Sequence, residues 1–362
     1  MVYIASLNKR PVKPHLTSMT LLIRDEDVKE AVTPEDVIDA VENVYCQHGL
    51  GRVQDTPRRE VRMKGKNLPH LAPGTTSVGQ GLSYLEEKNK VVVSHAFHLR
   101  EGEVTVSSLP PVTIPPYLIH IIDPDEGKTV AIIQSSYASW MRTGAAGAVG
   151  AKYLARKNSS VAGVIGTGLV GKGQLFFLTK VNNITKAFVH SGRRKDIEYA
   201  REMGSRLGID IVPSDSVEEV VKNSDILVTA TRATQPIVRG EWVRNGTHIN
   251  SIGADDPHKI ELDPATLGKA SKVVIDSERA PTWIGQIVLA IRQGVLKPEE
   301  ICSIGQVVAG LHPGREDDGE LTVFCCEGTN MQTAGVAVKV YEKVKDAGLG
   351  IETSSLSTYF LV

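Results

Sequence analysis

The sequence predicts an α/β protein with a doubly wound parallel sheet and a second, discontinuous domain that is mainly β and of the α+β type. Between about residues 160 and 310, short apolar runs alternate with helix-compatible segments, which is the pattern of a parallel sheet covered by helices. The first 135 residues lack this alternation and indicate strands after one helix. We therefore assign residues 139–320 to the doubly wound domain, and residues 1–138 and 321–362 to the other.

Composition limits the possible functions. The 362 residues, of which 41% are hydrophobic, suffice for two buried cores. A net charge of −1 gives no general attraction to nucleic acid or to a membrane surface, and no apolar run is long enough to span a bilayer. The four cysteines show no metal-ligand spacing, and the N-terminal segment has no signal-peptide core. We expect a cytoplasmic protein with no metal and with neither nucleic acid nor a membrane as partner.

The first domain contains one well-marked helix among strands. Thr33 is a typical N-cap, followed by Pro34 at the first helical position and by acids in the first turn. Apolar residues then recur at helical spacing as far as Tyr45. The turn-rich segment at residues 123–127 indicates a hairpin. The predicted strands of this domain cover residues 20–23, 91–93, 118–122 and 129–133.

The doubly wound domain begins with a helix rich in small residues, Met141–Ala155, which can pack very close to a neighbouring element. Its strands are predicted at residues 161–165, 187–189, 209–212, 226–230, 248–252 and 273–276. A last strand at residues 321–324 and a helix at about residues 331–347 follow. We expect this helix to return to the first domain and to make that domain discontinuous.

A glycine-rich turn joins the first strand of the doubly wound domain to its helix. It reads Gly166-Thr167-Gly168-Leu169-Val170-Gly171. In this context Gly166 permits the tight turn, Gly168 lets the backbone approach a pyrophosphate, and Gly171 lets the helix pack close to the strand. The sequence therefore predicts a Rossmann dinucleotide-binding domain. The alternative is a glycine-rich turn without a ligand.

The end of the next strand bears on which dinucleotide is bound. A carboxylate there would accept hydrogen bonds from the adenosine 2′-hydroxyl, but residues 186–195 contain none. Ser191, Arg193 and Arg194 stand there instead, and guanidinium groups suit a 2′-phosphate. We predict that NADP(H) is preferred and that NAD(H) is possible. A solvated basic loop is the alternative.

Three further segments are expected at the carboxyl edge of the sheet, where ligands bind in such folds. Asp255, after one strand, could act as a general base or hold a substrate amine. Arg142 could bind a substrate carboxylate through two parallel hydrogen bonds. Asp255 could instead be an ordinary turn acid, and Arg142 a surface residue. The predicted cofactor contacts in these segments are Thr143, Thr229, Ala230, Thr231, Ile252 and Gly253.

Three stretches together resemble the ornithine cyclodeaminase/μ-crystallin family. They are MRTGAAGAVGAKYLARKNSS (141–160), VAGVIGTGLVG (161–171) and GEWVRNGTHINSIGADDPHKIELD (240–263). The resemblance runs from about Leu21 to Gly350 and is thin between residues 50 and 115. The family includes ornithine and lysine cyclodeaminases, ketimine reductases and archaeal-type alanine dehydrogenases. It implies a nicotinamide cofactor, a small amino, imino or keto acid substrate, and a homodimer formed through the first domain.

The resemblance also implies roles for particular residues. Arg142 matches the arginine that binds the substrate α-carboxylate, and Thr143 lies by the cofactor phosphates. Asp255 matches the acid that cyclodeaminases and alanine dehydrogenases place beside the substrate amine, where ketimine reductases tend to carry another residue. A second carboxylate-binding arginine best matches Arg58. Its rivals are Arg59 and Arg62.

The family lysine, which carries a proton to or from the imine nitrogen, best matches Lys90, with Lys88 as a rival. Lysine suits this role because burial lowers its pKa. The alternative is a solvated lysine at a strand end. Residues 94–114 and 325–333 depart from the family pattern, the second at Thr333, where an aspartate is usual. Both segments are expected near the substrate.

From the sequence we expect an NADP(H)-dependent oxidoreductase that acts on the C–N bond of an α-amino or α-imino acid, with hydride exchanged at the α-carbon. Arg58 and Arg142 would bind the carboxylate, and Asp255 and Lys90 would serve the nitrogen. A redox-neutral cyclodeaminase that releases ammonia from ornithine or lysine is the first alternative. A non-enzymatic NADP(H)-binding protein like μ-crystallin is the second.

Overall fold

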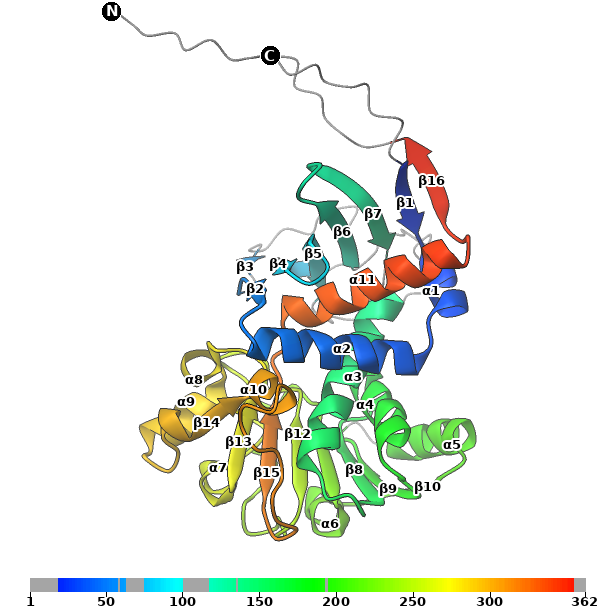
Figure 1. The fold of residues 1–362 in the computed structure, drawn as a ribbon. Coiled ribbons are helices and arrows are strands. Elements are labelled where there is room, and N and C mark those ends of the chain that lie inside the picture. Colours follow the sequence, from blue (N-terminus) through cyan, green and yellow to red (C-terminus); the bar gives the residue numbers. More distant parts are fainter. Residues whose placement is uncertain are drawn as a thin grey trace, which may run out of the picture.

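The computed structural model describes residues 19–57, 59–62, 75–99, 117–134, 136–192 and 195–354. Each of its two lobes is built on one β-sheet, and helices lie between the two sheets (Figure 1). Among the described residues, no helix combines the length and the apolar character needed to cross a membrane.

The first lobe holds a mixed sheet in the order β16-β1-β7-β6-β5-β4-β2, with β3 paired to β4. Only β1 and β7 run parallel, and the other neighbours are antiparallel. The strands are β1 (Met19–Ile23), β2 (Val53–Asp55), β3 (Arg59–Arg62), β4 (Thr75–Leu85), β5 (Lys90–Leu99), β6 (Tyr117–Asp123), β7 (Lys128–Gln134) and β16 (Ile351–Ser354).

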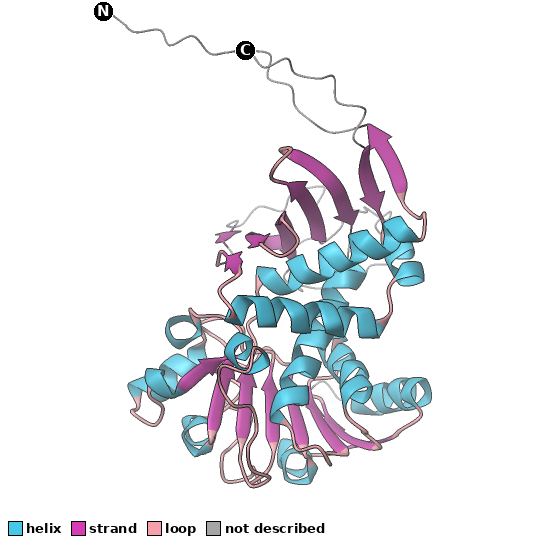
Figure 2. Cartoon of the chain, in the orientation of Figure 1, coloured by secondary structure: helices cyan, strands magenta, loops and turns pink. Residues whose placement is uncertain are grey.

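The helices of the first lobe cover one face of this sheet. They are α1 (Asp25–Ala31), α2 (Pro34–Gly49) and α11 (Asn330–Asp346). Thr33 caps α2 by accepting a hydrogen bond from the Asp36 amide at 3.1 Å, as the sequence predicts. Alternate strand residues such as Val92, Ile121 and Ile133 are fully buried beneath these helices. The arrangement of a helical layer between two sheets is clear in Figure 2.

The second lobe is an all-parallel sheet in the order β10-β9-β8-β11-β12-β15-β13-β14, which confirms the predicted Rossmann-type domain. The strand order reverses at β8, which is where such sheets bind their ligands. The strands are β8 (Val161–Ile165), β9 (Lys186–His190), β10 (Asp210–Pro213), β11 (Ile226–Thr229), β12 (His248–Ser251), β13 (Lys272–Ile275), β14 (Ile301–Ser303) and β15 (Thr322–Cys325).

The small-residue helix α3 (Ser136–Leu154) packs closely on α4 (Leu169–Val181). Its glycines permit this contact, because a Cβ atom added at Gly144 would clash with Phe177 and one at Gly147 with Gln174. The other helices of the lobe are α5 (Asp196–Leu207), α6 (Val217–Asn223), α7 (Pro264–Lys269), α8 (Ala280–Trp283), α9 (Gly285–Arg292), the 3₁₀ helix η2 (Pro298–Glu300) and α10 (Ile304–Val308).

The predicted placement of the last strand is wrong. The strand at residues 321–324 was assigned to the first domain, but β15 lies between β12 and β13 in the parallel sheet, with all four of its residues buried. A short apolar run does not reveal which strands it will pair with. The chain crosses to the first lobe only after β15, where α11 packs on α2 and on the inner face of the mixed sheet. Strand β4 was not predicted from the sequence. Glycine is required within it at residue 81, because an added Cβ would overlap Asn330.

We predict that the buried imidazole of His248 makes folding stability depend on pH. Burial, with Arg315 adding to it, lowers the pKa of His248 to about 3. Below about pH 6.5 the unfolded chain takes up a proton that the folded chain does not, so stability falls as the pH falls. The free energy of unfolding measured by urea titration should drop by about 2 kcal/mol from this residue between about pH 7.5 and about pH 5.

His248→Gln should remove this part of the pH dependence, although it also lowers stability at neutral pH. His258→Gln, in an exposed loop, is the matched control and should leave the pH dependence unchanged. An identical pH dependence in wild type and His248→Gln would contradict the prediction.

Candidate functional site

The glycine turn between β8 and α4 has the geometry of a phosphate-binding loop. Gly166 has a φ of +105°, and an added Cβ would clash with the carbonyl of Ala230. An added Cβ at Gly171 would clash with the carbonyl of Gly166. A Cβ at Gly168 would meet nothing within 4 Å, so the turn faces open space there. Close packing therefore requires glycine at residues 166 and 171, and Gly168 leaves room for a ligand.

The start of α4 supplies hydrogen-bond donors to that space. Gly168 is the N-cap residue and no side chain caps the helix, so the first-turn amides are left without a side-chain acceptor. The helix has 13 residues, and its dipole favours an anion at this end. Leu169 and Val170 expose 68% and 39% of their surface beside the turn. These features fit the pyrophosphate and adjoining groups of a dinucleotide.

Glu261 joins three of the predicted cofactor residues. Its carboxylate accepts hydrogen bonds from Thr229 Oγ1 at 2.7 Å, from the Thr231 amide at 2.6 Å and from the Gly253 amide at 3.0 Å. Burial raises the pKa of Glu261, and these donors act against that rise. The carboxylate therefore holds together the loops after β11 and β12. Sequence reasoning missed it, although an acid between Ile260 and Leu262 was a signal of a buried polar role.

The end of β9 is only partly described. The strand ends at His190, whose Nδ1 lies 2.9 Å from the Ser214 carbonyl, and Ser191 is buried. Arg193 and Arg194, on which the choice of NADP(H) depends, lie outside the described residues. Their role stays a prediction.

Arg142 is a buried cation on α3 without a described anionic partner. Its side chain lies beneath Gly328, and the residue is only 6% exposed. Nη1 donates to Gln332 Oε1 at 2.8 Å, while Nε is buried and has no hydrogen-bond partner among the residues that the structure describes. Among the described residues, no carboxylate lies within ion-pair distance of this guanidinium. A buried guanidinium with unused donors is suited to an anionic ligand.

A buried polar network stands behind Arg142. Gln332 Nε2 donates to Asp276 Oδ2 at 2.8 Å and to the Tyr45 hydroxyl at 2.7 Å. The Asp276 carboxylate also accepts hydrogen bonds from the Cys326 thiol and from the backbone amides of residues 327 and 328. Burial raises the pKa of Asp276 and of the Cys326 thiol. Sequence reasoning missed this network, because its members come from four separate segments.

Asp255 lies in the loop after β12 and is ion-paired with Lys259, which also approaches Asp256 at 3.6 Å. Burial alone would lower the pKa of Lys259, but the two carboxylates outweigh it and raise that pKa. The ammonium group of Lys259 donates its hydrogen bond to Oδ1 of Asp255. The Asp255 side chain is 42% exposed, and its predicted role beside a substrate amine stays a prediction.

Thr143 lies against the helix that follows the glycine turn. Its carbonyl accepts a hydrogen bond from Gln174 Nε2 at 2.6 Å, and its own hydroxyl donates to Ser139. Nearby, Trp140 Nε1 donates to the Leu169 carbonyl at 3.0 Å. The start of α3 is thus bonded to the start of α4. The predicted place of Thr143 beside the cofactor phosphates stays a prediction.

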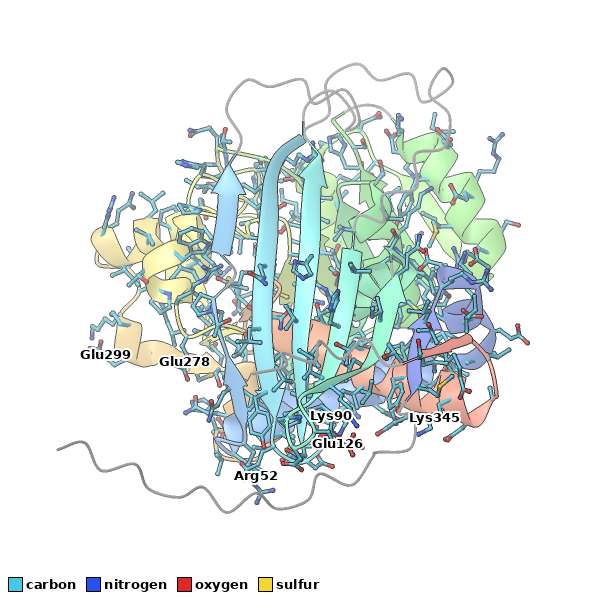
Figure 3. The ribbon with its side chains drawn as sticks, turned by 90° about the horizontal axis from the view of Figure 1, so that it is seen from above. Arg52, Lys90, Glu126, Glu278, Glu299 and Lys345 are labelled. Atoms are coloured by element: carbon cyan, nitrogen blue, oxygen red, sulfur yellow. The ribbon has the colours of Figure 1, made fainter. Side chains whose placement is uncertain are left out.

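The structure does not bring Lys90 into contact with these groups. Lys90 begins β5 and pairs with Asp123 at 3.0 Å, at the end of the sheet where Glu126 also lies (Figure 3). Further along β5, Ser94 forms a hydrogen bond with Asn330 of α11. Ser94 is four residues from Lys90, which corresponds to roughly 13 Å along a strand. The proposed proton role of Lys90 therefore lacks structural support. Arg58 lies outside the described residues, as do the side chains of its rivals in β3.

Known proteins resemble this chain in sequence and in fold. The family model for the ornithine cyclodeaminase/mu-crystallin family matches residues 18–348. The alanine dehydrogenase of Archaeoglobus fulgidus is 34% identical over 336 residues, which cover 91% of this chain and 97% of that protein.

Two solved structures share the whole fold. The delta(1)-pyrroline-2-carboxylate reductase of Thermococcus litoralis, in complex with NADH and L-proline, is 33% identical with a TM-score of 0.81, and covers 92% of this chain and 100% of that one. An archaeal alanine dehydrogenase dimer with bound NAD is 32% identical with a TM-score of 0.81, and covers 93% and 99%. The prediction of an enzyme is confirmed, and the chain belongs to the ornithine cyclodeaminase/mu-crystallin family.

Proposed function

We propose that the protein is a nicotinamide-dependent oxidoreductase that acts on the C–N bond of an α-amino or α-imino acid, with hydride exchanged at the α-carbon. The observation that carries this proposal is the buried, partly unpartnered guanidinium of Arg142, which shares α3 with the residues that pack on the glycine turn. An anion bound by Arg142 would lie beside the dinucleotide site. A substrate α-carboxylate is such an anion.

The relatives support this substrate class. One is an alanine dehydrogenase and another is a delta(1)-pyrroline-2-carboxylate reductase bound to L-proline. Both names describe compounds with a carboxylate and a nitrogen on the same carbon atom. The protein therefore needs one group for the carboxylate and another for the nitrogen.

In the proposed mechanism, the nicotinamide supplies hydride to the α-carbon, or accepts it, when the cofactor is bound. Arg142 binds the carboxylate and fixes the orientation of the α-carbon. The second oxygen of Asp255 would accept a hydrogen bond from the substrate nitrogen and stabilise the positive charge of the iminium, which forms when the neutral amine loses hydride and disappears when the iminium gains it. Glu261 keeps the loops that carry Thr231 and Gly253 in place against the cofactor.

Within this function we infer a preference for NADP(H) over NAD(H). The support is the absence of any carboxylate between Lys186 and Lys195, together with Arg193 and Arg194. The two relatives of known structure were solved with NADH and with NAD, so the finer choice depends on this chain's own loop.

We also infer a homodimer formed by the outer face of the mixed sheet. The inner face packs on α11, whereas on the outer face Leu82 is 42% exposed and Val93, Leu118 and Ile132 are only partly buried. Apolar residues gathered on one exposed face usually mark an interface. The archaeal alanine dehydrogenase is described as a dimer.

A cyclodeaminase remains the second candidate, because Asp255 is the acid that such enzymes place beside the amine. Its reaction would release ammonia from ornithine or lysine without net change in the cofactor. Asp255 alone does not separate it from an amino acid dehydrogenase.

The proposed reaction predicts that the protein oxidises NADPH in the presence of pyruvate or glyoxylate with ammonia, or of a cyclic imine carboxylate. Arg142→Met should lower kcat/KM by about 10- to 100-fold, because a charge-assisted hydrogen bond contributes about 1.5–3 kcal/mol. The matched control is Arg239→Met, because the Arg239 side chain is 64% exposed, and it should leave the rate unchanged.

Release of ammonia from ornithine or lysine with no net NADPH change would favour the cyclodeaminase, and absence of turnover on the whole panel would refute both. Lys90→Met in the same assay tests the proton role. A rate that falls sharply supports that role, whereas an unchanged rate rules it out.

The cofactor prediction is tested by removing both guanidiniums. Arg193→Ala with Arg194→Ala should raise the Kd of NADPH by about 10- to 100-fold and leave the Kd of NADH nearly unchanged, because only NADPH has the 2′-phosphate. Quenching of protein fluorescence measures both constants. An equal change in Kd for the two nucleotides would show that these arginines do not bind the 2′-phosphate.

The dimer prediction is tested with Leu82→Asp. A carboxylate buried in an apolar interface costs several kcal/mol, so the variant should sediment as a 39.1 kDa monomer while the wild type sediments at twice that mass. Leu311→Asp, at another exposed leucine, is the control and should remain dimeric. A wild type that is monomeric at micromolar concentration would exclude the interface.

A further inference from the structure

We infer that Gln332 is a positioning residue for Arg142: it holds the guanidinium through Nη1, so that a substrate carboxylate binds along the edge formed by Nε and Nη2. The inference rests on the proposed function and adds the residue that orients the carboxylate site. Gln332 stands in the first turn of α11 and is fully buried.

The contacts of Gln332 allow only one orientation of its amide. Oε1 accepts from Arg142 at 2.8 Å, and Nε2 donates to Asp276 at 2.8 Å and to Tyr45 at 2.7 Å. Rotating the amide by half a turn would set the NH₂ group against the guanidinium and the carbonyl oxygen against the Asp276 carboxylate. Both contacts would be repulsive, because a guanidinium only donates and a carboxylate only accepts. The partners therefore determine which end of the amide faces Arg142.

Asp276 is itself held firmly. It follows β13, and its carboxylate accepts from the Cys326 thiol at 3.1 Å and from the amides of Glu327 and Gly328 at 2.9 and 3.0 Å. These donors occupy both carboxylate oxygens. The loop after β15 thus binds Asp276 on one side, and Gln332 binds it on the other. The amide of Gln332 has a rigid support.

The remaining edge of Arg142, formed by Nε and Nη2, has no hydrogen-bond partner among the described residues. A guanidinium is planar and carries five donors, and Gln332 takes one at Nη1. Nε is buried without a partner, and no hydrogen bond or ion pair from Nη2 to a described residue is present. Nε and one hydrogen of Nη2 point in parallel, which matches the two oxygens of a carboxylate. A bound carboxylate would satisfy the donors that folding leaves unpaired.

The amide suits this position better than a carboxylate of the same shape would. A glutamate at residue 332 would form an ion pair with Arg142 and would compete with the substrate. It would also face the carboxylate of Asp276 at hydrogen-bond distance, which is repulsive. The neutral amide orients Arg142 and leaves its charge for the ligand.

The test compares Gln332→Glu, Gln332→Met and Tyr45→Phe in the full chain. Binding of pyruvate and of 1-pyrroline-2-carboxylate is measured by calorimetry on the protein saturated with NADP⁺, which cannot reduce either ligand, and kcat and KM are measured separately with NADPH. We expect the Kd and KM of the carboxylate to rise more than 10-fold in Gln332→Glu, by a smaller factor in Gln332→Met, and about 2-fold in Tyr45→Phe, which removes one of two acceptors of the amide. The Kd of NADPH should not change.

Gln286→Met is the matched control. It removes an equally buried amide, which bonds to the Glu261 and Leu262 amides and to Ser251 beside the cofactor loops. It should weaken NADPH rather than the carboxylate. If both glutamine variants weaken both ligands equally, their effect is general loss of structure and the inference fails.

The outcomes separate this inference from the function on which it rests. A wild-type protein that binds neither carboxylate refutes the proposed function and the carboxylate site together. A wild type that binds them, with Gln332→Glu and Gln332→Met unchanged in Kd and KM, refutes only the positioning role. If the Gln332 variants fail to fold, Tyr45→Phe still tests the inference, because it removes a hydrogen-bond partner of the Gln332 amide and leaves Gln332 itself unchanged.

Discussion

The buried guanidinium of Arg142 is the constraint on which the site depends. A charge in a protein interior is costly unless hydrogen bonds or an opposite charge satisfy it. Here one amide oxygen accepts from a single donor, and the same amide bonds to Asp276 through its nitrogen. Within the described part of the chain, this cation is therefore oriented but not neutralised. That is the state in which a cation can bind an anion strongly.

Two buried carboxylates stabilise the two sides of the site. Glu261 accepts backbone and hydroxyl donors from the loops after β11 and β12, and Asp276 accepts them from the loop after β15. Each lies near the carboxyl ends of parallel strands, where loops must be held in a fixed position to bind a ligand. The carboxylates of Glu261 and Asp276 thus accept hydrogen bonds from groups of the protein itself. Arg142 and the partly exposed Asp255 are the charged groups that we propose for the substrate.

The site needs both lobes. Tyr45 comes from α2 and Gln332 from α11, which pack under the mixed sheet, whereas Asp276 and the glycine turn belong to the parallel sheet. The chain passes directly from β15 into α11, so the loop that binds Asp276 also carries Gln332 across to the first lobe. A shift of α11 against the parallel sheet would change the support of Arg142.

The sequence by itself determined the Rossmann-type domain, the cap of α2 and the glycine turn, because each depends on local spacing or on backbone conformation. It also singled out Arg142 and Asp255 as candidates. Only the tertiary structure decided that β15 lies inside the parallel sheet, that Lys90 pairs with Asp123, and that Glu261 and Gln332 support the site. Gln332 meets Arg142 across 190 residues and Tyr45 across 287. Such contacts follow from strand order and from the packing of distant helices, and periodicity along the chain carries no information about either.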